Sequence, residues 1–166
     1  ASALAPKSPM RRTLHEKFPD ANFINFVRNP LRVIPSSVSM FSNHWKTYGD
    51  PEDEYPQPGS TTILEHAHHW YIYPHQYLKN LPPDQYKMVR YKDLVADPQG
   101  MVESIYEQFG IEMTPAYHQI LHQESEKAKQ YKSSHQYSLE EMGLDQQEIA
   151  REFQHAVSDY DLDLKE

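Results

Sequence analysis

Arg28 and Ser36 could together bind an anion. Arg28 directly follows the apolar stretch of residues 21–27, and Ser36 comes eight positions later, beyond the pair Asn29-Pro30. A guanidinium group offers two parallel donors to the oxygens of a phosphate or sulfate. A helix that begins at Pro30 would add backbone N–H groups and the positive end of its dipole. The spacing therefore predicts an anion site, although an arginine at a strand end can also simply pair with a carboxylate.

A second group of reactive side chains lies between Glu65 and His69. On a helix, Glu65 and His69 are four positions apart and His66 and His69 are three apart, so two or three of them could converge on a metal ion. His68 would point elsewhere, and the metal-binding pattern H-E-x-x-H does not occur in the sequence. Since the chain has 10 histidines, a chance cluster is common. We expect no metal here, but a helix with His68 or His69 facing a cleft and Trp70 in the core.

Charge is distributed unevenly along the chain. The 166 residues have a formal net charge of -8, but the first 46 hold seven Lys/Arg against two Asp/Glu and so carry +5, which leaves -13 on the other 120. An anion would bind in the basic stretch. Binding of duplex DNA depends on many contacts from Lys and Arg to phosphates, so we expect no nucleic-acid partner for this acidic protein.

Strands and the helices that follow them must position these groups. Apolar runs predict buried strands at residues 21–27 and 86–91, and the end of a short strand at 4–7. Asn29-Pro30 and Asp97-Pro98 each supply an N-cap and a first-turn proline, and Gly110 ends the second of these helices. The alternation predicts an α/β fold with a mainly parallel sheet flanked by helices. Further helices are expected at 8–17, from 30 onward with a kink at Pro35, at 62–73 ending ahead of Pro74, at 115–124, and near the C-terminus with Ile149, Phe153, Ala156, Val157 and Tyr160 aligned.

The whole chain, residues 1–166, is predicted to be a single domain. Within it, residues 48–60 are rich in Pro, Gly, Asp and Glu and predict a variable surface loop, and residues 127–135 predict a basic polar loop. The chain has no cysteine, which excludes disulfides and thiolate metal sites, and no G-x-S-x-G elbow of a serine hydrolase. No apolar run approaches the roughly 18 residues of a membrane span. The compartment stays open, with the cytoplasm slightly favoured.

Ligands of α/β folds bind beyond the carboxyl ends of the strands, which here means Lys7, Arg28 and Tyr91. At these positions the sequence resembles a known family. Arg-x-Pro after a strand, followed at this distance by Ser36, resembles the 3'-phosphate motif of sulfotransferases that use 3'-phosphoadenosine 5'-phosphosulfate (PAPS). The segment VRYKDLVADP at 89–98 resembles the family's RYEDL…P block, with Lys92 in place of an acid. The stretches 7–10, 18–21, 135–139 and 143–144 also resemble the broad, often bacterial branch of that family.

The resemblance implies a P-loop-NTPase-like fold and a role for individual residues. Arg28 and Ser36 would hold the 3'-phosphate, and Tyr91 would lie beside the adenine. Lys7 matches a lysine near the transferred sulfuryl group, where its charge would stabilise the transferring and bridging oxygens. The basic loop lies where related enzymes close a segment over the nucleotide, so it could contact the 3'-phosphate. The alternative interpretation is that it is simply a solvated loop. Its candidates for a further contact to the 3'-phosphate are Lys129, Lys132 and His135.

One feature of the family is not found. Its members carry a 5'-phosphosulfate-binding loop before the Arg-x-Pro motif, and a loop of this kind is rich in glycine. The five glycines here are never closer than ten residues apart, so the sequence contains no such glycine-rich loop. We therefore expect a fragment of a longer enzyme, with the sulfotransferase fold incomplete at its N-terminus. The alternative is a shortened relative that serves as a non-catalytic nucleotide-binding or assembly module. A missing strand would leave apolar sheet surface uncovered, so self-association is expected.

The reaction that the resemblance implies is in-line transfer of a sulfuryl group from PAPS to a hydroxyl or amine of a small-molecule or glycan acceptor, without a metal. Such catalysis needs positioning, charge stabilisation and a base for the acceptor proton. Related cytosolic enzymes have a histidine shortly after the strand-end lysine, but here Lys7 is followed by Ser-Pro-Met-Arg. The sequence does not identify the acceptor, because acceptor pockets form from variable loops such as 48–60. Candidate bases are Glu65, His66, His68 and His69.

Overall fold

The computed structural model describes residues 14–48, 56–130 and 137–164 of the chain. It divides into two compact units. The sheet unit comprises Ala1–Val27 and Pro74–Ser134, and the helical unit comprises Arg28–Tyr73 and His135–Glu166. Whether residues 1–166 fold as a single domain stays a prediction.

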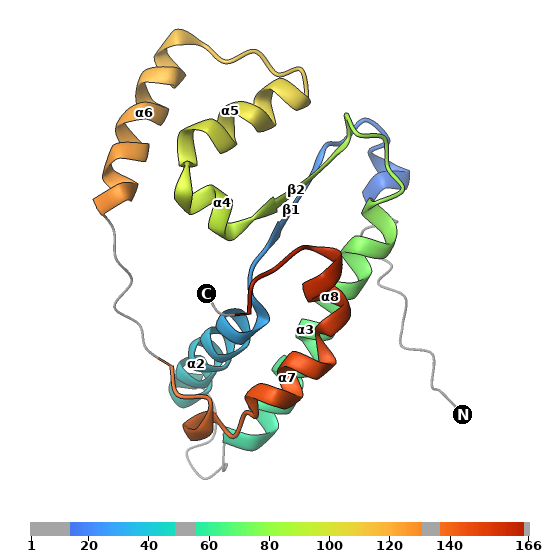
Figure 1. Cartoon of the computed structure of the whole chain (residues 1–166), viewed down its shortest axis with the longest axis vertical. Coiled ribbons are helices and arrows are strands. Elements are labelled where there is room, and N and C mark those ends of the chain that lie inside the picture. The colour runs from blue at the N-terminus through green and yellow to red at the C-terminus, as the bar shows by residue number, and fades with distance from the viewer. Residues whose placement is uncertain (1–13, 49–55, 131–136, 165–166) are drawn as a thin grey trace. The chain divides into compact units, whose positions relative to one another are not determined.

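The sheet unit contains two parallel strands and the helices after the second strand. Strands β1 (Phe23–Val27) and β2 (Tyr86–Arg90) pair in parallel with Phe23 opposite Tyr86 and Val27 opposite Arg90, which confirms the predicted parallel pairing. Three helices follow β2: α4 (Tyr91–Ala96), α5 (Pro98–Gln108) and α6 (Pro115–Gln130). Figure 1 shows α5 and α6 packed side by side. Two of the predicted strands are thus present, whereas residues 4–7 lie outside the described residues.

Strand β1 is less buried than its apolar run predicts. Val27 and Asn25 are buried, but Ile24 and Phe26 are 41% and 57% exposed. Side chains alternate between the two faces of a strand, so residues 24 and 26 share one face. Strand β2 contributes Lys87 and Val89 to the same face. Val89 is fully buried, and Lys87 Nζ donates a hydrogen bond to the Ser104 carbonyl of α5 at 3.1 Å. Helix α5 therefore covers β2 and leaves the apolar side chains of β1 at the surface.

The predicted signals for α5 are confirmed. Asp97 Oδ1 accepts a hydrogen bond from the backbone N–H of Gly100 at 3.0 Å, and Pro98 is the first helical residue. Gly110 has φ +63°, the left-handed conformation that favours glycine after a helix. Helix α6 extends beyond the predicted end at 124, because Lys127 and Lys129 pair with Glu124 and Glu126 one turn earlier. Those two lysines are helical rather than part of a loop.

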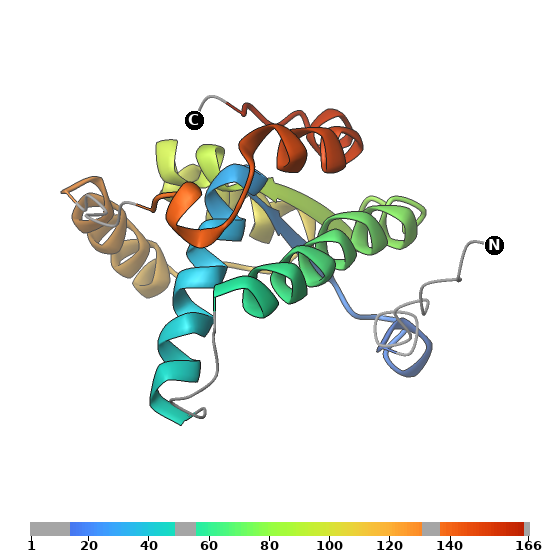
Figure 2. The same ribbon diagram turned by 90° about the horizontal axis from the view of Figure 1, so that it is seen from below.

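The helical unit packs four helices and a short 3₁₀ turn. They are α2 (Pro30–Tyr48), α3 (Pro56–Leu78, of which Pro74–Leu78 belongs to the sheet unit), η1 (Glu140–Met142), α7 (Gln146–Glu152) and α8 (Gln154–Asp159). Figures 1 and 2 show α7 and α8 running alongside α3. The ring of Phe153 joins them, with its centroid 5.4 Å from that of Tyr71 and 6.0 Å from that of His68. The core of this unit is formed by Ile34, Val38, Ile63, Ala67, Tyr71, Leu144, Ile149, Phe153, Ala156 and Tyr160.

Three further helix boundaries differ from the predicted ones. Helix α3 does not end ahead of Pro74 but continues to Leu78, because the side chains of Tyr71, Pro74 and Leu78 are all buried and their packing offsets one lost backbone bond. The same helix already begins at Pro56, so the predicted loop at 48–60 is shorter; residues 49–55 lie outside the described residues. The predicted C-terminal helix is two helices, separated at Phe153.

Among the described residues, no helix has the length and apolar character needed to cross a membrane.

Candidate functional site

The helical unit contains two of the predicted ligand residues. Arg28 precedes α2, and Ser36 lies in the second turn of that helix. Tyr91, the first residue of α4, belongs to the sheet unit and is 41% exposed. Arg28 and Tyr91 each come directly after a strand, as predicted. Lys7, Lys132 and His135 lie outside the described residues.

Asn29 fixes the start of α2. Its side-chain Oδ1 accepts a hydrogen bond from the backbone N–H of Leu31 at 2.8 Å, and its carbonyl accepts from Arg32 and Val33. The amide Nδ2 of the same side chain donates to the carbonyl of Asp163 at 2.8 Å. With 3% of its surface exposed, Asn29 is therefore both the predicted N-cap and a link to the end of the chain.

The backbone of Arg28 is held from within the unit while its side chain is at the surface. Its carbonyl accepts a hydrogen bond from the hydroxyl of Tyr71 at 2.5 Å, and the Tyr71 carbonyl accepts one from the hydroxyl of Tyr160 at 2.7 Å. Burial raises the pKa of Tyr71 well above its ordinary value, an effect that the positive charge of Arg28 partly opposes. Two buried tyrosines thus fix the turn from which the exposed Arg28 side chain projects.

Ser36 lies beside a residue from the far end of the sequence. Its hydroxyl donates to the Tyr137 hydroxyl at 3.3 Å, across 101 positions. Both side chains are half-buried and so have surface left for a ligand. Sequence analysis assigned no role to Tyr137, and its one signal was its place in the motif-like stretch 135–139. Tyr71 and Tyr160 have no comparable signal, because nothing in a linear pattern links them to Arg28.

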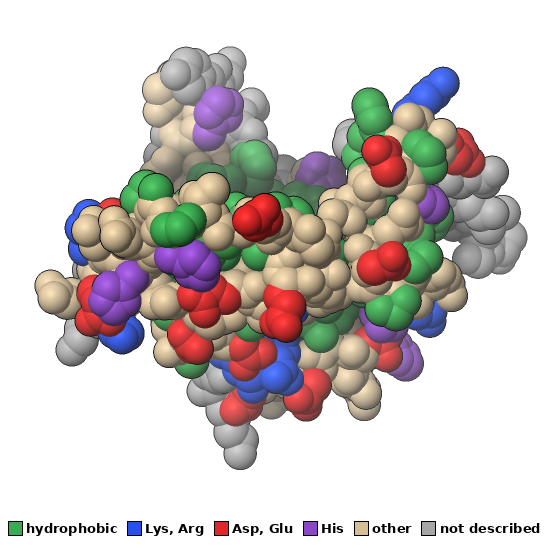
Figure 3. Space-filling model, turned by 90° about the horizontal axis from the view of Figure 1, so that it is seen from above, with side chains coloured by type: hydrophobic (Ala, Val, Ile, Leu, Met, Phe, Trp, Pro, Cys, Tyr) green, Lys and Arg blue, Asp and Glu red, His purple; other side chains and the backbone are tan. Residues whose placement is uncertain are grey.

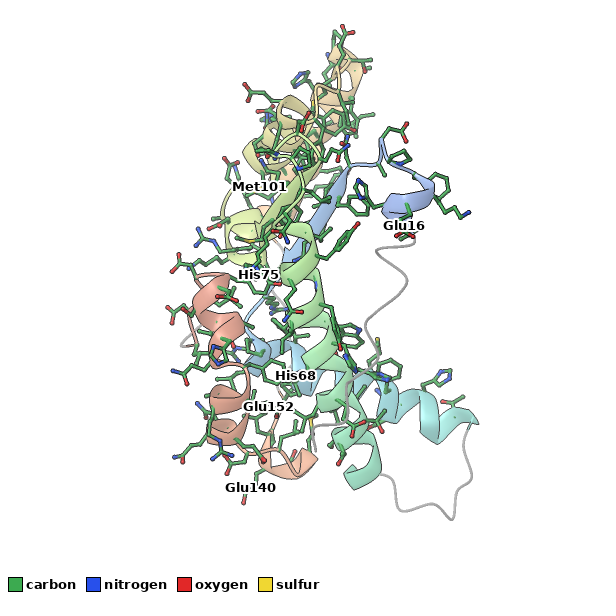
Figure 4. The ribbon with its side chains drawn as sticks, turned by 90° about the vertical axis from the view of Figure 1, so that its right-hand side faces the viewer. Glu16, His68, His75, Met101, Glu140 and Glu152 are labelled. Carbon is green, nitrogen blue, oxygen red and sulfur yellow. The ribbon has the colours of Figure 1, made fainter. Side chains whose placement is uncertain are left out.

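The histidines of α3 point to different neighbours. His66 lies near Trp70, His68 meets the edge of Phe153, and His69 stacks on Tyr73 with ring centroids 5.0 Å apart. Figure 4 shows His68 on α3 beside the end of α7, where Glu152 is labelled. Within the described ranges, no three His, Asp or Glu side chains are grouped as metal ligands would be.

The prediction that Trp70 lies in the core is wrong, since 44% of its surface is exposed. The buried stripe of α3 runs instead through Ile63, Ala67 and Tyr71, at the spacing of one helix face. Trp70 lies next to that stripe rather than on it.

The charged surface is mainly acidic away from the basic N-terminal stretch. On the face drawn in Figure 3, acidic side chains are widely spread and basic ones gather at a few places. An anionic ligand is repelled by such a surface except where arginine or lysine is present.

Comparison with known proteins agrees with the motif. Residues 6–115 match the sequence model of the Sulfotransferase family, and the chain belongs to that family. Among curated proteins it is similar to the omega-hydroxy-beta-dihydromenaquinone-9 sulfotransferase Stf3 of Mycobacterium bovis and of Mycobacterium tuberculosis, with 26% identity over 138 residues in both cases. The match covers 80% of this chain but 34% of each relative, so the chain spans about a third of their length. No solved structure matches the chain.

Proposed function

We propose that this chain carries the 3'-phosphoadenosine part of a PAPS site in a sulfotransferase. The observation that carries the proposal is the arrangement at the start of α2. An exposed arginine projects from a turn whose carbonyl is held by Tyr71, and Ser36 follows in the same helix. A cation and a hydroxyl near a capped helix start suit a phosphate dianion. Arg28 and Ser36 are the ligands that the family motif assigns.

The resemblance assigns roles to four more residues, and these belong to the proposal. The exposed ring of Tyr91 offers a face on which an adenine can stack. Lys132 and His135 are proposed as further cationic contacts to the 3'-phosphate, and His135 is only two positions from Tyr137 in the sequence. Lys7 is proposed to stabilise negative charge on the sulfuryl group. The P-loop-like fold of the family belongs to this proposal as well.

The proposed reaction is sulfuryl transfer to a hydroxyl or amine of a small-molecule or glycan acceptor. The acceptor oxygen or nitrogen forms a bond to sulfur as the bond to the bridging oxygen of PAPS breaks, and adenosine 3',5'-bisphosphate leaves. The acceptor proton passes to a base. The name of the Stf3 relatives contains a hydroxylated compound, which favours a hydroxyl acceptor for this chain. A metal ion is not required for any of these steps.

Calorimetric titration tests the proposal directly. Adenosine 3',5'-bisphosphate and adenosine 5'-phosphate are compared on the wild-type chain and on Arg28→Ala. We expect the bisphosphate to bind more tightly, and Arg28→Ala to weaken it by about 10- to 100-fold, because charge-assisted bonds to phosphate contribute about 1.5–3 kcal/mol each. Arg151→Ala on α7, an equal change of charge at another exposed arginine, is the control and should bind as the wild type does.

A second function, a non-catalytic nucleotide-binding or assembly module, is favoured by the wide spacing of the glycines. The two functions differ in turnover. Incubation with PAPS and hydroxyl or amine acceptors, with release of adenosine 3',5'-bisphosphate and recovery of the sulfated acceptor, would establish transfer by this chain. Binding without release fits both the module and a fragment of a longer enzyme, and no binding by folded protein contradicts both functions.

A further inference from the structure

Resting on the proposed function, we propose that Tyr137 is a second hydroxyl ligand of the 3'-phosphate, acting together with Ser36. The starting observation is the 3.3 Å contact between the two hydroxyl groups. Both residues belong to the helical unit, so their juxtaposition arises within one compact body. Residue 137 also lies beyond the matched family range of 6–115, so the family model says nothing of it.

The segment that carries Tyr137 is firmly attached to its own unit. The hydroxyl of Ser138 accepts a hydrogen bond from the backbone N–H of Glu141 at 3.2 Å. The hydroxyl of Ser60, on α3, donates to the carbonyl of Met142 at 2.7 Å and is itself buried. Leu144 adds a buried apolar side chain just after the turn. Tyr137 is therefore presented by a fixed turn, as a ligand residue should be.

The chemistry of two adjacent hydroxyls suits a phosphate group. A tyrosine hydroxyl can donate its hydrogen to an anion and can accept one from a neighbouring hydroxyl. In the structure the Ser36 hydrogen is used for the Tyr137 oxygen. A phosphate dianion has three acceptor oxygens, so both hydroxyls can turn and donate to it.

The side chain and the ligand are varied together in the test. Adenosine 3',5'-bisphosphate, adenosine 3'-phosphate and adenosine 5'-phosphate are titrated into the wild type, Tyr137→Phe, Ser36→Ala and the double variant. We expect Tyr137→Phe to weaken both 3'-phosphorylated ligands by about 10-fold, which corresponds to about 1.4 kcal/mol, and to leave adenosine 5'-phosphate unchanged. Tyr73→Phe removes a tyrosine hydroxyl elsewhere in the helical unit and should change none of the three affinities.

The outcomes separate this inference from the proposed function. If the wild type binds the bisphosphate, Arg28→Ala weakens it and Tyr137→Phe does not, the inference alone is overturned. If Tyr137→Phe weakens all three ligands equally and lowers the thermal midpoint, its role is structural and the inference is again wrong. Absence of binding to the folded wild type overturns the proposed function and this inference together.

Discussion

The hydroxyl of Tyr71, in the middle of α3, donates to the backbone carbonyl of Arg28 at 2.5 Å. Tyr71 is 6% exposed, and its own carbonyl accepts from the hydroxyl of Tyr160, which is 1% exposed. The motif residue at the protein surface therefore depends on two core residues. Stability and ligand binding should be coupled through this contact.

Replacement of Tyr71 by phenylalanine tests that coupling. The ring and its edge contact with Phe153 are kept, but the Arg28 carbonyl loses a donor. We expect the free energy of unfolding to fall by about 1–3 kcal/mol, and the affinity for adenosine 3',5'-bisphosphate to fall as well. Urea denaturation and calorimetry measure the two quantities, with Tyr73→Phe as control. Unchanged affinity in a clearly destabilised variant would show that Arg28 does not need this hydrogen bond.

The raised pKa of Tyr71 predicts a loss of stability in alkali. Below pH 10 the phenol is protonated in both the folded and the unfolded chain, so it has no effect on the pH dependence. Above about pH 10 the unfolded chain releases this proton while the folded chain retains it, because burial raises the pKa in the folded state. The free energy of unfolding should then fall by about 1.4 kcal/mol per pH unit from this residue.

Denaturation of the wild type and of Tyr71→Phe between pH 8 and 11 isolates this effect, since the contributions of the other tyrosines cancel in the difference. The difference in unfolding free energy between the wild type and Tyr71→Phe should become smaller above pH 10. A gap that stays constant up to pH 11 would contradict the assignment.

Replacement of Asn29 by the isosteric aspartate should destabilise the fold. Asn29→Asp keeps the acceptor for the Leu31 N–H but replaces the donor to the Asp163 carbonyl by an oxygen. Two acceptors then face each other in a buried position. The loss of stability from this arrangement is larger than the gain from a negative charge at the N-terminus of the helix. We expect a loss of about 1–3 kcal/mol in unfolding free energy. Asn29→Ser, which keeps a cap but adds no charge, should lose less, and the reverse order would disprove this reasoning.

The local elements could be predicted from the sequence, whereas the long-range contacts could not. Asp97, Pro98 and Gly110 define α5 through their own caps, and the structure confirms each one. The pairing of Tyr137 with Ser36 spans 101 positions and depends on tertiary packing, which leaves no local pattern. At Pro74 the local pattern was misleading for the same reason. Proline predicts the end of the helix, but α3 continues to Leu78 because its side chains around Pro74 are buried by tertiary packing.

Substitutions of Gly100 in α5 and of its N-cap Asp97 should affect stability in a coupled way. A methyl group on this residue would lie 2.2 Å from Oδ2 of Asp97, so Gly100→Ala must displace the carboxylate that caps the helix. The lost cap costs about 1 kcal/mol, which offsets a gain in helix propensity of about the same size. Gly100→Ala should therefore be nearly neutral alone but stabilise an Asp97→Ala background by about 1 kcal/mol. Equal effects in both backgrounds, measured by urea denaturation, would refute the coupling.

The exposed face of β1 predicts association of this chain. Ile24 and Phe26 lie on the same face of the strand and are 41% and 57% exposed, beside a β2 that α5 covers. Uncovered apolar side chains on a sheet are a common cause of self-association. Phe26→Thr introduces a β-branched residue that favours a strand and removes the larger of the two apolar side chains. Sedimentation velocity over a range of concentrations should show less association for Phe26→Thr than for the wild type. Met40→Thr removes an equally exposed apolar side chain from α2 and is the control. A wild type that is monomeric at all concentrations, or a Met40→Thr that dissociates as fully as Phe26→Thr, would mean that this face of β1 does not drive association.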